Sequence, residues 1–165
     1  MAGKYAAETQ VSPEKSRMEI QATLTRYGAD SFVFATSPQG ATVMFEAHGR
    51  KVRFDLTMPD PAAREFRFSP AGRPRDGRAT QAAYEQDVRQ RWRALLLTIK
   101  ALLEAIEVGL LSFDEAFLAH IMVQDGSTVG GSLIPRLDEI SDQRALMAPF
   151  QYSRYAKQIE GGVDE

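Results

Sequence analysis

The hydrophobic period of this chain changes from two to about 3.6 between residues 31 and 108, and this change restricts the possible folds more than any other feature. Apolar and polar residues alternate in SFVFATS, ATVMFEAH and KVRFDLT, which cover residues 31–37, 41–48 and 51–57. Turn-forming residues separate these segments, at Pro38-Gln39-Gly40 and at Gly49. The pattern predicts a three-stranded antiparallel meander with an apolar face made by Val43, Phe45, Val52, Phe54 and Leu56.

Beyond the predicted strands, apolar residues recur at helical spacing over residues 79–108, a stretch that includes the single tryptophan, Trp92. This continuous stripe predicts a long helix that places Trp92 in the core. Near the start of the chain, Ser12 and Pro13 are typical of a helix beginning and Gly28 is typical of a helix end. A first helix is therefore expected before the strands.

Two shorter helices are expected after the long one. Ser112 and Glu115 form the signature of a capping box, which predicts a helix running through Ile121. Asp125-Gly126 predicts a tight turn between two very short strands, and a last helix is predicted for residues 132–141.

Together these elements predict an α+β fold, in which the long helix packs on the apolar face of the meander and the terminal helices close the core. A chain of 165 residues that is 44% hydrophobic fits a single domain. We expect a flexible N-terminus at 1–11, one α+β domain at 12–142 and a C-terminal tail at 143–165.

The composition favours some compartments and chemistries over others. Because the chain has no cysteine, we expect it to work in the reducing cytoplasm, without disulfides or thiolate metal sites. No run of about 18 apolar residues and no signal-peptide pattern is present, so no membrane contact is expected. His48 and His120 lack metal-type neighbours, and adjacent carboxylates point in different directions on a helix. We therefore expect no metal, no cofactor and no catalytic residue.

A connector rich in arginine and proline lies between the last predicted strand and the long helix. The stretch from 57 to 78 contains four prolines, which disfavour helix and central strand, so it is expected to be a long loop. Its residues 63–78 carry five arginines against only Glu65 and Asp76, in a chain whose formal net charge is -2. Such local clustering of cations is typical of a polyanion contact. The arginines are Arg64, Arg67, Arg73, Arg75 and Arg78.

Other cations extend this surface on the predicted elements. Arg89 and Arg93 lie on one flank of the apolar stripe of the long helix, and Lys51 and Arg53 lie on or beside the polar face of the sheet. With the connector they could line a groove in which phosphates meet cations and bases stack on flat side chains. The alternative is structural: Arg89 would pair with Glu85, and Arg93 with Glu104 or solvent, over the helix flank.

Several segments resemble a family of small uncharacterised proteins encoded in phages, prophages and other mobile elements. The resemblance is carried by LTRYGADSFVFATSPQGATVMFEAHGRKVRFDL, QRWRALLLTIKALLEAIE and FLAHIMVQDGSTVG, and covers roughly Pro13 to Ile140. Separately, the order of one helix, a three-stranded meander and a long helix is similar to the core layout of the single-strand annealing proteins used in phage recombination. That likeness, which is one of topology alone, implies an oligomer that holds DNA along a basic groove.

These observations lead to two main functional hypotheses, with an enzyme as a third option. The first is a non-catalytic nucleic-acid-binding protein, with single-stranded DNA as its ligand, acting in phage or mobile-element DNA metabolism. The alternative is a protein-binding module, an inhibitor or adaptor that docks an acidic host protein through the same arginines. We also expect a homo-oligomer, because a three-stranded sheet leaves two edges to be covered.

Overall fold

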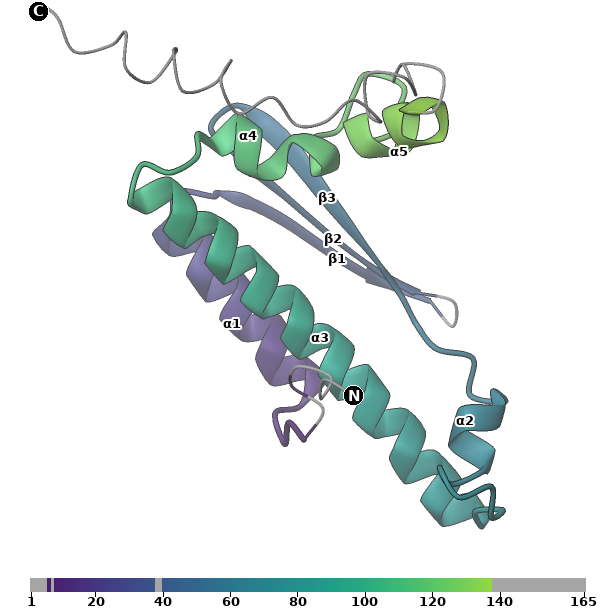
Figure 1. Cartoon of the computed structure of the whole chain (residues 1–165). Coiled ribbons are helices and arrows are strands. Elements are labelled where there is room, and N and C mark those ends of the chain that lie inside the picture. The colour runs from purple at the N-terminus through teal and green to yellow at the C-terminus, as the bar shows by residue number, and fades with distance from the viewer. Residues whose placement is uncertain (1–5, 7, 38–39, 138–165) are drawn as a thin grey trace, which may run out of the picture. The chain divides into compact units, whose positions relative to one another are not determined.

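The computed structural model describes residue 6, residues 8–37 and residues 40–137, and it confirms the predicted α+β fold. Three strands and a long helix form the main body (Figure 1). The chain divides into two compact units, Met1–Gly130 and Gly131–Glu165. The sheet and all helices up to residue 120 belong to the first unit.

The sheet is the predicted meander, with β1 at Ser31–Thr36, β2 at Gly40–Ala47 and β3 at Arg50–Thr57. The strands are antiparallel in the order β1-β2-β3. The β2–β3 connection is a two-residue turn in which His48 (φ 53°) and Gly49 (φ 70°) both have positive φ, as the right-handed twist of a hairpin favours. The expected apolar face is confirmed, because Val43, Phe45, Val52 and Phe54 are buried and Leu56 is partly buried.

Helix α1, Pro13–Arg26, begins and ends where the sequence indicates. The Ser12 hydroxyl accepts a hydrogen bond from the backbone N–H of Lys15, which satisfies one of the free donors of the first turn. Gly28 adopts a φ of 87°, the left-handed conformation that ends many helices. The buried face of α1, formed by Ile20 and Leu24, joins the core between the sheet and α3.

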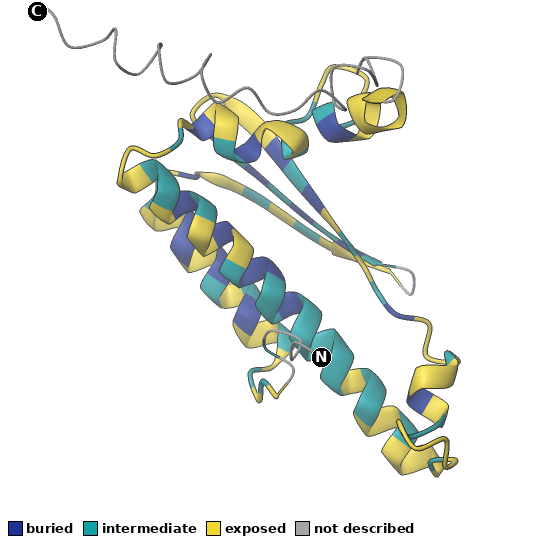
Figure 2. Cartoon of the chain, in the orientation of Figure 1, coloured by how far each residue is buried: buried dark blue, intermediate teal, exposed yellow. Residues whose placement is uncertain are grey.

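Helix α3, Gly77–Glu107, is the long predicted helix. It begins two residues before the expected start because the Asp76 carboxylate accepts a hydrogen bond from the Ala79 N–H at 2.7 Å and so caps the helix. Its buried residues lie between Trp92 and Leu103, and Figure 2 shows that the N-terminal turns are partly or fully exposed. Trp92, with 2% of its surface exposed, is a core residue as predicted.

Helix α4, Phe113–Phe117, places the fully buried Phe117 against the sheet, where its ring meets Phe45 and Phe54 edge-on. The predicted continuation through Ile121 is instead a 3-10 turn, η1, at Leu118–His120. The chain then forms a bridge from Ile121 to Val52 and a second bridge, from Met122 to Thr128. The second bridge spans the expected turn at Asp125-Gly126.

Two predicted segments differ in the structure. The connector is not a continuous loop, because it contains a helical turn, α2, at Arg64–Arg67 and a bridge from Phe68 to Pro74. The last helix begins earlier than predicted, with α5 at Val129–Leu133, and passes into a 3-10 turn, η2, at Ile134–Arg136.

The remaining predictions for the chain ends fall partly beyond the described residues. The end of the predicted last helix and the tail at 143–165 both lie outside them. In the N-terminal segment, the Thr9 carbonyl accepts a hydrogen bond from the side-chain amide of Gln86 on α3, at 3.0 Å. Residue 9 is therefore attached to the long helix.

Candidate nucleic-acid interface

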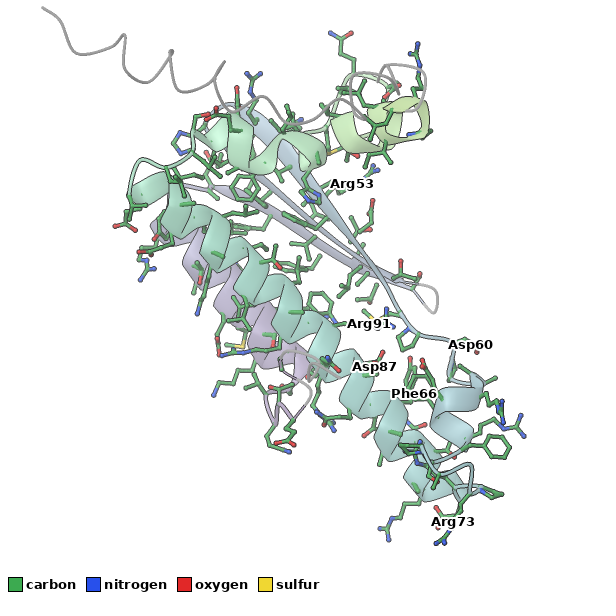
Figure 3. The ribbon with its side chains drawn as sticks, viewed as in Figure 1. Arg53, Asp60, Phe66, Arg73, Asp87 and Arg91 are labelled. Carbon is green, nitrogen blue, oxygen red and sulfur yellow. The ribbon has the colours of Figure 1, made fainter. Side chains whose placement is uncertain are left out.

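The arginine-rich connector, residues 57–78, is fastened to α3 at the point where β3 ends. The Arg91 guanidinium donates to the Thr57 carbonyl at 2.8 Å and pairs with Asp87 at 2.6 Å, one helical turn away. Figure 3 shows Arg91 and Asp87 on α3 and Asp60 in the chain that leaves β3. The Asp60 carboxylate accepts from the Ala62 N–H at 2.9 Å, which sets the turn before α2.

Phe66 anchors α2 to the long helix. Only 4% of its surface is exposed, and its ring meets the Tyr84 ring at right angles with 5.8 Å between centroids. Edge-to-face pairs of this kind add to the stabilisation that burial alone supplies. Phe66 lies outside the main hydrophobic cluster between the sheet and the helices. The connector therefore has an apolar contact of its own.

Arg75 braces the connector from within. Its Nη1 donates to the carbonyls of Glu65 at 2.8 Å and Phe66 at 3.2 Å, and its backbone N–H donates to the Arg67 carbonyl at 2.8 Å. These carbonyls come at the end of a helical turn, where they have no partner within the helix. Arg75, predicted to contact phosphate, thus has a structural contact already.

A tight turn presents Arg73 at the far end of the connector (Figure 3). The Ser69 N–H donates to the Arg73 carbonyl at 2.8 Å, and the Arg73 N–H donates to the Ser69 hydroxyl at 3.1 Å. Gly72 has a φ of 76°, a conformation that other residues rarely adopt. The backbone that carries Arg73 is therefore hydrogen-bonded on both sides of the turn.

Four connector arginines, Arg64, Arg67, Arg73 and Arg78, have exposed side chains. None of them forms an ion pair with another described residue. The guanidinium of Arg64 lies over the Phe68 ring, 5.6 Å from its centroid. An open hollow of about 550 Å³ lies here, lined by Arg64, Glu65, Phe68, Ser69, Pro70, Gly72 and Arg75. The four exposed arginines and this hollow constitute the candidate interface.

The helix arginines included in the prediction are paired instead. Arg89 donates to the Gln86 side chain at 2.7 Å and lies 3.9 Å from Glu85, as the structural alternative had it. Arg93 pairs with Glu19 of α1 at 2.8 Å, rather than with Glu104. About a quarter of each arginine side chain is exposed. Their charges are therefore balanced by neighbours before any ligand binds.

The two sheet cations lie apart from the connector. Arg53 pairs with Asp55 at 3.0 Å and donates to the Gly126 carbonyl at 2.6 Å, so it fastens the 121–128 turn to β3. Lys51 is exposed, but it lies six residues before Thr57, about 20 Å along the strand at the usual rise. The predicted cations thus form three separate groups, of which only the connector group is largely unpaired.

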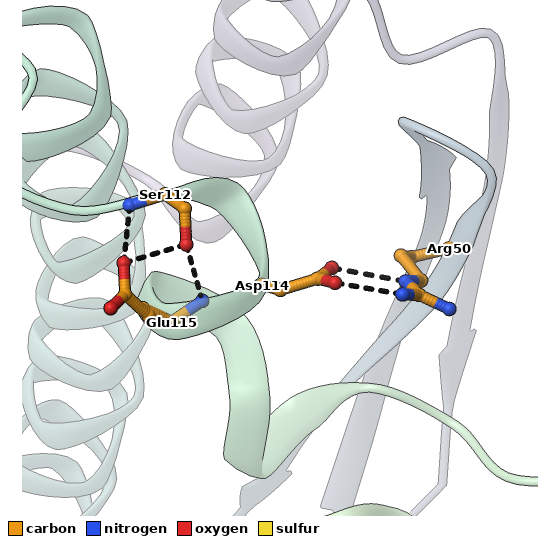
Figure 4. A network of polar contacts seen from close by, with 4 residues as sticks. All are labelled: Arg50, Ser112, Asp114 and Glu115. Carbon is orange, nitrogen blue, oxygen red and sulfur yellow. Dashed lines mark hydrogen bonds and ion pairs between the residues drawn. The ribbon is translucent and has the colours of Figure 1, made fainter.

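Sequence reasoning missed several arginines with structural contacts, among them Arg91 and Arg50. Arg91 joins α3 to β3 as described above, and its spacing of four from Asp87 was the available signal. Arg50, at the start of β3, makes a two-pronged ion pair with Asp114 of α4, at 2.7 and 3.0 Å (Figure 4). The Arg50 contact holds the pKa of Asp114 below its usual range. Figure 4 also shows the predicted capping box between Ser112 and Glu115.

His120 is packed rather than presented to solvent. Its ring stacks on Phe54 with 3.9 Å between centroids, and burial lowers its pKa. Among the described side chains, no three histidine, aspartate or glutamate residues come close enough together to hold a metal ion. No helix in the described ranges is both long and apolar enough to cross a membrane.

Comparisons with known proteins give no further guide to the site. No protein-family model, no curated protein and no solved structure matches the chain.

Proposed function

We propose that this protein binds nucleic acid without catalysing a reaction, that its ligand is single-stranded DNA, and that it serves phage or mobile-element DNA metabolism. The observation that best supports this proposal is that the arginines differ in whether they form ion pairs. Arg67, Arg73 and Arg78 are exposed and make no ion pair within the described residues, whereas Arg50, Arg53, Arg91 and Arg93 pair closely with acids. Unpaired cations on an ordered backbone are suited to phosphate, because binding breaks no existing ion pair.

The neighbouring ring favours a single strand over a duplex. Phe68 is partly exposed beside the open hollow, and the Arg64 guanidinium lies over it. An unpaired base can stack on such a ring, which is worth about 1–3 kcal/mol per base, whereas bases in a duplex are already stacked. The arginines would supply affinity for the backbone and Phe68 a preference for exposed bases.

A salt titration with labelled oligonucleotides tests this proposal. If the four exposed connector arginines each neutralise one phosphate, the logarithm of affinity should fall with the logarithm of salt at a slope of about -3 for a single strand. The variant Arg67→Gln/Arg73→Gln/Arg78→Gln should reduce that slope to about -1 and weaken binding to every sequence alike. Arg75 is left intact because it braces the connector.

A matched control removes the same charge elsewhere. Lys15→Gln/Arg26→Gln/Lys100→Gln also removes three exposed cations, from α1 and from α3 beyond the connector, and should change binding little. Absence of binding to single-stranded and duplex oligonucleotides at low salt would overturn the proposal. If the connector variant instead lost an acidic host protein in a pull-down, the inhibitor or adaptor alternative would take its place.

Two further parts of the proposal concern setting and assembly. We propose a cytoplasmic location, since nucleic acid is available there and a chain without cysteine needs no oxidising compartment. We also propose that the protein acts as a homo-oligomer, which would bring more than one connector to a single strand.

A further inference from the structure

Among the residues that the structure describes, strand β1 is an edge strand without the features that usually block pairing. Within the described residues it is hydrogen-bonded to β2 alone. Its sequence, SFVFAT, contains no charge and no proline, which are the usual means of blocking an exposed edge. The opposite edge differs, because β3 carries Arg50, Lys51, Arg53 and Asp55 and is partly covered where the Met122 N–H donates to the Lys51 carbonyl at 2.7 Å.

The hydrogen bonds at the end of the β1–β2 hairpin show which backbone groups of β1 do not face β2. Ser37 and Gly40 exchange both backbone hydrogen bonds, at 2.7 and 3.3 Å. In antiparallel pairs such bonded positions alternate along the strand, so odd-numbered residues of β1 face β2. The N–H and C=O groups of Phe32, Phe34 and Thr36 therefore point away from the sheet. No other strand lies beside them in the described part of the chain.

The side chains of β1 are also incompletely covered. Phe32 and Phe34 lie opposite the buried Phe45 and Val43, so they point into the core, but both are only partly buried. Val33 points to the other face and is 48% exposed. Two aromatic rings and a valine along an unpaired edge would gain burial from a neighbouring strand that matches them.

We propose that β1 pairs with β1 of a second copy of this chain, antiparallel and about a two-fold axis that passes beside Val33. In this register Phe32 lies opposite the partner's Phe34, and Phe34 lies opposite the partner's Phe32. Two aromatic pairs therefore form on the core side. Val33 lies opposite the partner's Val33. The two three-stranded sheets become one sheet of six strands, with the helices of both copies on the same face.

Backbone direction and side-chain face both select this register. Pairing must match the outward-facing groups of one strand with those of the other and keep apolar faces on the same side, so only even-numbered offsets are allowed. Moving the partner by two residues would place Phe32 opposite Thr36 and leave only one aromatic pair. No charged residue lies within β1, so the two copies meet without like charges in opposition.

The size of the contact sets its expected strength. Stable dimers bury about 1,200–2,000 Å² in total, and a pair of six-residue strands supplies only part of that area. The proposal therefore predicts a dimer that dissociates on dilution. It concerns the protein free of nucleic acid, so it stands or falls independently of the connector.

Single-cysteine variants test the register directly, because the chain contains no cysteine of its own. In the proposed dimer Val33 and its symmetry mate form a non-hydrogen-bonded pair with Cα atoms about 4.5 Å apart, which a disulfide can bridge. Val33→Cys should thus cross-link under mild oxidation to about twice the 18.3 kDa of one chain. In the Ala35→Cys variant the new cysteine lies opposite Ser31 of the second copy, so this variant should not cross-link.

A charge variant tests the association without any covalent bond. Val33→Lys places two like charges opposite each other and should raise the dissociation constant about tenfold or more in sedimentation velocity. Val33→Thr, which keeps an uncharged β-branched residue, should retain the dimer. Thermal melts confirm that each variant folds. A wild-type monomer at every concentration, or equal cross-linking of both cysteine variants, would overturn the proposal.

Discussion

Ser16 is fully buried in α1, yet its hydroxyl has no hydrogen-bond partner within the described residues. A buried hydroxyl without a partner costs about 1–3 kcal/mol, because it loses its contacts with water and gains none in return. The serine is small enough to fit where α1 packs against the core. The Ser16 hydroxyl therefore lowers the stability of the fold without forming a hydrogen bond within the described residues.

We expect Ser16→Ala to stabilise the protein by about 1 kcal/mol, through loss of the unsatisfied hydroxyl and the higher helix propensity of alanine. Urea denaturation followed by circular dichroism measures this. Ser12→Ala provides the contrast, since it removes the cap of the same helix and should cost about 1 kcal/mol. Marked destabilisation by Ser16→Ala would mean that the hydroxyl has a partner in solution.

At the scale of elements, α3 contributes most of the helical side of the core. Its residues Trp92, Leu96, Ile99 and Leu103 are buried together with Val43 and Val52 of the sheet. Leu96 and Ile99 have no exposed surface. The free energy that holds the helix on the sheet should therefore be concentrated in its C-terminal part.

Truncating Leu96 or Ile99 to alanine should each lower the free energy of unfolding by about 2–5 kcal/mol, because a cavity is left where the side chain was. Thr98→Ala, at an exposed position next to them, should change it by less than about 0.5 kcal/mol. Chemical denaturation measures both. Similar effects for the exposed and the buried positions would show that the helix does not pack as described.

The elements predictable from sequence are those with local signals. Ser12, Gly28 and the Ser112–Glu115 box mark helix ends through contacts within a few residues, and the alternation of β2 and β3 records burial on one face. Helix α2 could not be found in this way. Its four residues lie among prolines, and it is held by Phe66 packing on Tyr84, 18 positions further along the chain.

The candidate site was predictable as a cluster but not as a set of contacts. The density of arginine in the connector was evident from sequence. Which arginines remain unpaired depends on partners distant in sequence, such as Glu19 for Arg93, or on backbone carbonyls, as for Arg75. Neither kind of partner leaves a pattern in the spacing of residues.

For the molecule as a whole, stability should fall on acidification. Protonation of His120 should cause the first decrease. Burial against Phe54 lowers its pKa below the ordinary value of 6.5. Because the unfolded chain then binds the proton more readily, stability is full above about pH 6.5 and decreases as the pH falls from there through the folded-state pKa. The lowered carboxylate pKa values of Asp114 and Glu115 act in the same direction at lower pH.

Replacing His120 with glutamine should remove the decrease in stability between about pH 7 and pH 5, while the carboxylate-dependent decrease below that range remains. Thermal melts across this range measure it. His48→Asn, at the exposed turn where asparagine tolerates positive φ, is the control and should retain the step. An unchanged profile in the His120 variant would contradict the assignment.

Phe66 is buried, but it does not belong to the cluster that holds the sheet and the helices together. The part of the connector around α2 is thus held largely by contacts outside that cluster, among them the Phe66–Tyr84 pair and the hydrogen bonds of Arg75. Such a segment can open at a free energy well below that of global unfolding. On the proposed function, a substitution at Phe66 should therefore disorder the connector and abolish nucleic-acid binding, while the sheet and the long helix stay folded.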